Sequence, residues 1–167
     1  MAGAQLHRVE VTPKSLPGLI DTRGESIRRQ LLSDHDFKVT EVRSITGFLV
    51  FADLSINQQQ QMVNDLFCDP IIEHGRVNSQ ILDDEKLFPT PPDLVIQIGF
   101  KPGVTDNAAQ AGLDGLQTLF PEEGMDAAVS TTMTYTFHGL PPSTDSNWLA
   151  GQLHNQMIER ALITESD

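Results

Sequence analysis

One short pattern occurs twice in this chain, and it constrains the fold more than any other feature of the sequence. An alternating apolar segment is followed by a lysine, a Pro-Gly pair and an aspartate, at residues 9–21 and again at 96–106. The two lysines are 87 positions apart and the two glycines 85, because Ser15 and Leu16 lengthen the first copy. Two copies are too few for a solenoid, so the repeat predicts one body with an approximate twofold axis.

The first copy is expected to contain four strands and two helices. Asp21 is a suitable N-cap, since its carboxylate can accept hydrogen bonds from free amides of the first helical turn. Ser55 and Gln58 form a capping box, and Asp69-Pro70 ends the second helix because proline cannot continue the hydrogen-bond ladder. Gly47 permits a tight turn between two strands. The strands are expected at 8–14, 39–45, 48–51 and 77–82, and the helices at 21–33 and 55–68. The irregular spacing of Val39, Val42 and Ile45 indicates either a bulge in the second strand or a strand that starts near Glu41.

The second copy follows the same order. A strand is expected at 95–101, a helix opened by Asp106 or Asn107 and ended by Pro121, one long strand or a hairpin at 129–137, and a last helix capped within 143–146. Residues 160–167 contain only a three-residue apolar stretch. We therefore expect the final strand to be short or missing, or the chain to be cut from a longer polypeptide.

These elements predict an α+β fold made of a tandem pair of ferredoxin-like β-α-β-β-α-β subdomains with antiparallel sheets and a pseudo-twofold axis. The first repeat is expected at 1–82 and the second at 94–167. Residues 83–93, which are acidic and rich in proline, are expected to form an exposed and fairly stiff linker. The bare faces of the two sheets are expected to pack together, or their edges to join, as in a homodimer made covalent.

The composition excludes some classes of function. The chain has 11 Lys and Arg against 23 Asp and Glu, a net charge of −12, which argues against a surface for nucleic acid or anionic membrane. The single cysteine, Cys68, excludes an intrachain disulfide and is expected to be a buried structural thiol. No signal peptide is visible at the N-terminus, and no apolar run approaches the roughly 20 residues needed to span a bilayer. We expect a cytoplasmic protein that spans no membrane.

No catalytic motif is found. The chain has neither a phosphate-binding P-loop nor a G-x-G-x-x-G fingerprint, and its five histidines are scattered, so no catalytic, cofactor-binding or metal-binding residue is predicted. The recurring turns are the only candidate sites, and they are open to three interpretations: ordinary turn and cap chemistry, an anion site beside a helix N-terminus, or a docking surface used twice. The candidate residues are Lys14, Gly18, Asp21, Arg23, Lys101, Gly103, Asp106 and Asn107.

Three features occur together in this chain: the two turns, the strand at Val42-Arg43, and the related segments 69–73 (Asp-Pro-Ile-Ile-Glu) and 155–159 (Asn-Gln-Met-Ile-Glu). In this combination the chain resembles the PurS subunit of phosphoribosylformylglycinamidine synthase, which is also called formylglycinamide ribonucleotide amidotransferase. The signature of that family is close to K-P-G-V-x-D near the N-terminus and N-x-V-I-E near the C-terminus. Residues 101–106 match the first part very well. The resemblance covers residues 8–82 and 94 to the end of the chain.

The resemblance implies a function in purine biosynthesis without catalysis by this chain. In that family the small subunit is a dimer that bridges a glutaminase and an ATP-dependent synthetase and helps to route ammonia between them. In the large single-chain form of the enzyme, an N-terminal domain resembles that dimer fused in tandem. We therefore expect an assembly domain or subunit of this ligase complex, monomeric as a covalent pseudo-dimer, with no cofactor of its own; further dimerisation is left open.

A second hypothesis is a regulatory module that senses a small metabolite, since paired ferredoxin-like units often bind metabolites where they meet. Its site would lie at the Pro-Gly turns, facing Lys14 and Lys101.

Overall fold

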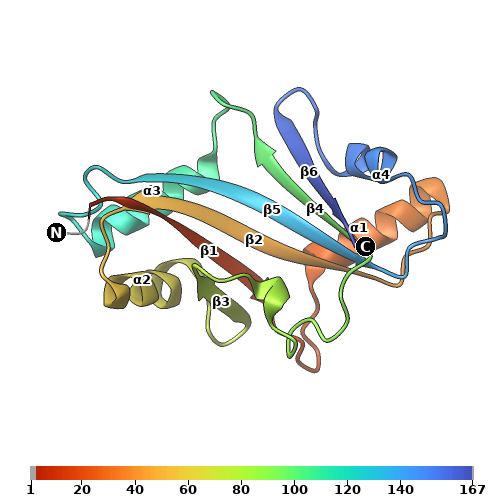
Figure 1. Ribbon diagram of the computed structural model, residues 1–167, viewed down its shortest axis with the longest axis horizontal. Helices are drawn as coiled ribbons and strands as arrows, with labels where there is room; N and C mark the ends of the chain where they lie inside the picture. Colours follow the sequence, from red (N-terminus) through yellow and green to blue (C-terminus); the bar gives the residue numbers. More distant parts are fainter. Residues whose placement is uncertain (1–2, 167) are drawn as a thin grey trace.

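A single antiparallel sheet of six strands organises the protein, as seen in a computed structural model that describes residues 3–166 (Figure 1). The strand order is β3-β1-β2-β5-β4-β6. The strands are β1 (Gln5–Pro13), β2 (Glu41–Ala52), β3 (Glu73–Val77), β4 (Leu94–Phe100), β5 (Ala128–His138) and β6 (Glu159–Glu165). The helices are α1 (Thr22–His35), α2 (Ile56–Met62), α3 (Asn107–Leu119) and α4 (Ser146–Leu153), with a π-helical turn η1 (Val63–Phe67) and a 3₁₀ turn η2 (Ile81–Asp83).

The fold is α+β with alternating strands and helices and is compatible with ferredoxin-like folds. Each half contains three strands rather than the expected four, and the strands share one sheet. The expected turn at Gly47 is wrong, because β2 runs straight through this residue. A Cβ atom at position 47 would lie 2.2 Å from the Thr132 hydroxyl of the paired strand β5, so glycine serves a close contact between strands here.

Two further strand predictions are corrected. The third strand of the first half is Glu73–Val77 rather than 77–82, and Ile81–Asp83 is the 3₁₀ turn η2. The final strand, expected to be short or missing, is β6, whose seven residues all pair with β4. Only three apolar residues were visible there, but a strand at the edge of a sheet with one open face needs few of them.

The predicted helix starts are confirmed. Asp21 and Asp106 cap α1 and α3, and Ser55 with Gln58 forms a complete capping box at α2. The last helix is capped by Asp145, within the predicted range. Trp148 anchors α4 as expected, because its ring lies 5.2 Å from His35 and 5.4 Å from Phe37, centre to centre.

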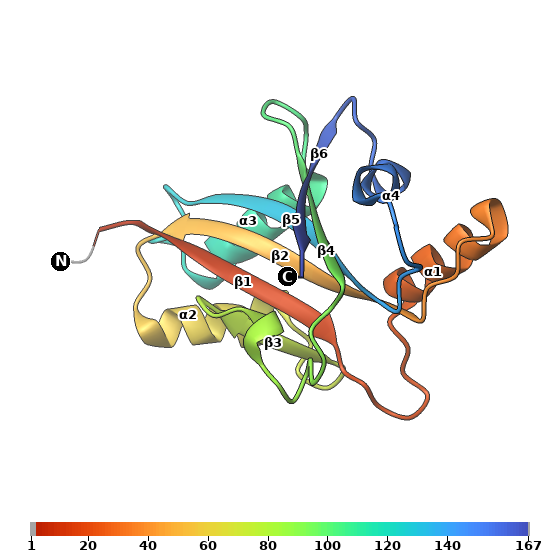
Figure 2. The same cartoon turned by 45° about the vertical axis from the view of Figure 1, so that its right-hand side comes forward.

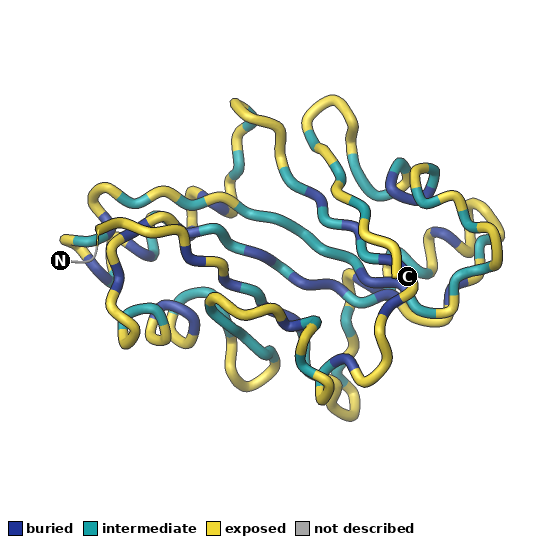
Figure 3. The backbone as a smooth tube through the Cα atoms, in the orientation of Figure 1, coloured by how far each residue is buried: buried dark blue, intermediate teal, exposed yellow. Residues whose placement is uncertain are grey.

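All four helices pack on one face of the sheet, in two clusters that mix the halves of the chain. Helices α2 and α3 lie at one end of the sheet, and α1 and α4 at the other (Figures 1 and 2). Leu116 of α3 packs with Val9 and Val50 of the first half. Leu31 of α1 packs with Ile96 and other residues of the second half. The first helix of each half lies over its own central strand, β2 or β5, and its buried side chains join a core cluster that includes residues of the other half. The buried residues follow the central strands (Figure 3).

The linker at 83–93 lies against the other face of the sheet. It connects β3, at one edge, with β4, next to the opposite edge, and therefore crosses the central strands. Phe88 is 5% exposed and packs with Ile81 against Ile45 of β2. The expectation of an exposed linker is therefore wrong at Phe88 and Pro92, which are buried, and correct at acidic residues such as Glu85. The three prolines and the charges gave no sign of this contact.

Cys68 is half-buried rather than fully buried. Its Sγ lies 3.7 Å from the Glu73 carbonyl oxygen, and it packs against the cluster under β1. Burial raises the pKa of the thiol, which lowers its thiolate fraction at neutral pH. These contacts favour a structural role for Cys68.

Candidate interaction surfaces at the two Pro-Gly turns

The two lysines of the repeat make the same contacts. The ammonium of Lys14 donates to the Pro70 carbonyl at 2.6 Å, and that of Lys101 donates to the Gln156 carbonyl at 2.5 Å. Their backbone amides donate to Ile72 and Ile158, each at 2.8 Å. Each lysine therefore fixes the loop that leads into an edge strand, β3 or β6.

The Pro-Gly turns also agree, despite the two additional residues in the first copy. Leu19 N donates to the Leu16 carbonyl, and Val104 N donates to the Lys101 carbonyl, closing four-residue turns. Gly18 and Gly103 have φ of +79° and +84°, the left-handed conformation that a type II turn requires at its third residue. Glycine is needed at these two positions because a side chain would strain the backbone.

The loops before β3 and β6 are built by the residues of the second motif. Ile71 N donates to Asp69 Oδ1 and Met157 N to Asn155 Oδ1, both at 3.0 Å. The Glu73 and Glu159 carboxylates accept from the amides of residues 69 and 155, both at 2.9 Å. An oxygen-bearing first residue and a final glutamate are therefore structural requirements of this loop.

Each of these loops displays apolar side chains to solvent. Ile71 is 77% exposed and Met157 85%, while Ile72 and Ile158 are 42% and 40% exposed. We call the set Lys14, Ile71 and Ile72 the first turn surface, and the set Lys101, Met157 and Ile158 the second turn surface. Exposed apolar side chains at equivalent positions of both loops have no role in the core and are typical of interaction surfaces.

The two turns do not meet. They lie toward opposite edges of the sheet, one beside β1 and β3 and the other beside β4 and β6 (Figure 1). Arg23 is exposed at the start of α1, and its guanidinium lies 3.7 Å from the Met133 sulfur. Asn107 is the exposed first residue of α3. The eight predicted residues therefore do not come together in one site, although Arg23 of the first half reaches β5 of the second.

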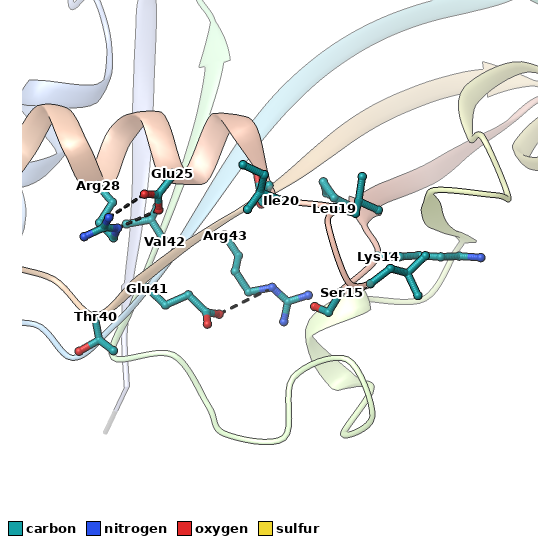
Figure 4. A pocket seen from close by; sticks show the side chains of 13 residues that line it. Lys14, Ser15, Leu19, Ile20, Glu25, Arg28, Thr40, Glu41, Val42 and Arg43 are labelled. Carbon is teal, nitrogen blue, oxygen red and sulfur yellow. Dashed lines mark hydrogen bonds and ion pairs between the residues drawn. The ribbon is translucent and has the colours of Figure 1, made fainter.

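A depression of about 500 Å³ borders the first turn (Figure 4). Lys14 points away from the other charged side chains that line it. Arg28 forms two hydrogen bonds to Glu25, at 2.6 and 2.8 Å, which hold the pKa of that carboxyl near 2. Arg43 donates to the Leu87 carbonyl, and its burial lowers the pKa of its guanidinium. Because these cations already have partners within the chain, the geometry favours docking over anion binding.

The capping aspartates have a second role that the sequence did not reveal. Besides Gly24 N at 2.9 Å, the Asp21 carboxylate accepts from Ser44 N and Ser44 Oγ, at 2.6 and 2.7 Å. Asp106 binds Thr131 N and Oγ1 in the same way, at 2.9 and 2.8 Å. Ser44 and Thr131 are 87 positions apart, which is the spacing of the lysines and the one signal that could have identified them.

We expect Asp21→Ala to lower the free energy of unfolding by about 2 kcal/mol. About 1 kcal/mol comes from the lost helix cap, and a similar amount from the Ser44 amide left without its acceptor. The matched control is Asp145→Ala, which removes an exposed cap that accepts only from Asn147 and Trp148 of its own helix. Urea unfolding should show the smaller loss for Asp145→Ala. Equal losses would contradict the second role of Asp21.

A scan against protein-family models and a search of curated proteins found no match to this chain. Among residues 3–166, no three His, Cys, Asp or Glu side chains come together in a way that could hold a metal ion. None of the helices in that range is both long enough and apolar enough to cross a membrane.

Proposed function

We propose that this chain is a non-catalytic assembly module with two equivalent docking surfaces. We further propose that it serves phosphoribosylformylglycinamidine synthase in purine biosynthesis, as an assembly domain or subunit that bridges the synthetase and glutaminase parts and assists ammonia transfer. Under this proposal the protein is cytoplasmic, and its two halves are a tandem pair of ferredoxin-like, PurS-like units.

The observation that carries this proposal is the duplication of the turn surface. Both copies place a lysine beside a loop with two exposed apolar residues, and both are fixed by the same hydrogen bonds. A single body that carries equivalent surfaces at opposite edges of one sheet could bind two partners at the same time. The motifs that build these surfaces are the ones that resemble the PurS family.

The test is size-exclusion chromatography with light scattering, using the whole chain and the synthetase and glutaminase of the same organism, with glutamine and ADP present. The chain alone should elute as a monomer and should join a larger species with its partners. Met157→Asp should weaken this association at least tenfold, because it places a charge at the centre of the second turn surface. Ile56→Asp is the matched control, since Ile56 is 82% exposed and lies at the start of α2.

Two outcomes would refute the proposal. One is a chain that ignores both partners, and the other is a reconstituted enzyme that assembles and turns over equally well without it. Equal weakening by Met157→Asp and Ile56→Asp would leave the assembly role intact and would remove the second turn surface from it.

A metabolite-sensing module is the second candidate function. The depression beside Lys14 favours it, because charged side chains of both signs line this depression. Titration calorimetry with purine nucleotides, glutamine and other amino acids should give saturable heat if this function is correct, and no heat would count against it.

A further inference from the structure

The linker shows how a peptide segment can bind the open face of this sheet. Phe88 packs on Ile45, and the Arg43 guanidinium lies 3.9 Å from the centre of the Phe88 ring. Arg76 forms an ion pair with Asp84. The amide of Ile81 donates to the Glu10 carboxylate at 3.2 Å. This segment forms the 3₁₀ turn η2 and then a turn in which Leu87 N and Phe88 N donate to the Asp84 carbonyl. A folded segment with acidic and apolar residues is therefore held on the open face by two arginines and an apolar patch.

In the second half, the strand positions equivalent to Arg43 and Ile45 are not covered by any segment within residues 3–166. By the spacing of 87, Thr132 corresponds to Ile45 and Ser130 to Arg43. Thr132 lies between Gly47 of β2 and Gly99 of β4 in the sheet. A hollow of about 610 Å³ borders these strands, and Leu162 of β6, on its rim, is 64% exposed.

The hollow is deep at Gly99 because glycine has no side chain to fill the open face of the sheet there. A Cβ atom at Gly99 would meet only the Thr132 methyl group, at 3.8 Å, so nothing within the described chain fills the space above it. The open strip, as we call it, consists of Leu49, Gln97, Gly99, Thr132, Arg160 and Leu162.

The charge at the open strip is opposite to that of the whole chain. Arg160 and Lys101 line the hollow and are exposed, and neither takes part in an ion pair within residues 3–166. The Lys101 ammonium donates one of its three hydrogens to the Gln156 carbonyl, which leaves two for a partner. Asp106 also borders the hollow, but its carboxylate is occupied by the α3 cap and by Thr131. On a chain with a net charge of −12, a local pair of cations selects for acidic partners.

We propose that the open strip binds a short segment of a partner protein that carries carboxylates next to a large apolar side chain. The apolar side chain lies on Leu49 and Leu162, and the carboxylates face Arg160 and Lys101. The linker supplies the precedent, because its own sequence places Asp83, Asp84 and Glu85 just before Leu87 and Phe88. This site lies on the open face of the sheet and does not depend on the identity of the complex proposed above.

The probe is a fluorescein-labelled peptide with the sequence of residues 80–92, titrated with the whole chain and followed by fluorescence anisotropy. We expect saturable binding in the range of about 10–100 μM, weakened by added salt because exposed charges are screened. A second peptide with Ala in place of Leu87 and Phe88 should bind at least tenfold more weakly.

Two variants of the chain locate the binding. Arg160→Glu and Leu162→Glu change exposed side chains and should each weaken the peptide at least tenfold. Lys38→Glu is the matched control for Arg160→Glu, since it makes the same change in net charge at an exposed loop between α1 and β2, and it should leave binding unchanged. Thermal unfolding confirms that each variant is folded. No saturable binding up to about 1 mM, or binding that Arg160→Glu and Leu162→Glu leave unchanged, would overturn the proposal.

Discussion

Neither half of this chain should fold as a monomer on its own, whereas the two halves mixed should restore the native structure. A cut after Glu85, which is exposed, gives fragments of residues 1–85 and 86–167. The first fragment loses Leu116 and Phe120, which lie in the core under β1 and β2. The second loses Leu31 and Val42 from the core under β4 and β5.

The expected effect exceeds the stability of an ordinary domain. Each large side chain that loses its buried environment costs about 1.5–3 kcal/mol, and each fragment loses several of them together with the β2–β5 pairing. The total stability of a typical domain is only about 5–15 kcal/mol. Far-ultraviolet circular dichroism and light scattering should show unfolded or self-associated single fragments and one folded 1:1 species on mixing.

A fragment that folds only as a homodimer would agree with this prediction. In the β2–β5 pair, Ile45 lies opposite Thr134 and Gly47 lies opposite Thr132. By the repeat spacing of 87, Thr132 is the equivalent of Ile45 and Thr134 is the equivalent of Gly47, so the pairing is symmetric. Two copies of β2 could therefore pair in the same way. A cooperative thermal transition from a monomeric fragment would contradict the dependence of each core cluster on both halves.

We expect Gly24→Ala to lower the free energy of unfolding by about 3 kcal/mol or more, although alanine is the better helix former. Gly24 is buried in the first turn of α1, and a Cβ atom there would lie 2.1 Å from the Val42 carbonyl oxygen. Because the obstacle is the backbone of β2, the whole helix would have to move away from the sheet. That movement would also stretch the bonds from Asp21 to Ser44.

Gly151→Ala is the matched control, since it makes the same change in helix α4. A Cβ atom there would meet only the Gln156 side-chain nitrogen, at 3.6 Å, which is an ordinary contact. It should stabilise the protein by about 0.5–1 kcal/mol through helix propensity. Urea denaturation of both variants measures the difference, and a stabilising Gly24→Ala would show that α1 does not approach β2 so closely.

The loops at 69–73 and 155–159 resemble the PurS family in their amino-acid sequence, but these residues are needed because they form hydrogen bonds within the loop. Their exposed apolar residues, Ile71 and Met157, were not among the predicted site residues because burial cannot be read from five residues of sequence. The predicted lysines proved to be anchors of those same loops.

The sequence by itself determined the repeat, the helix starts and the Pro-Gly turns. These features depend on interactions within a few residues, such as Asp21 with Gly24 or Ser55 with Gln58, so local spacing is enough to find them. Only the tertiary structure decided that six strands share one sheet, that both core clusters combine residues of the two halves, and that Phe88 covers Ile45. Those outcomes rest on contacts between residues about 40 to 100 positions apart, where cross-strand packing and burial outweigh local preference.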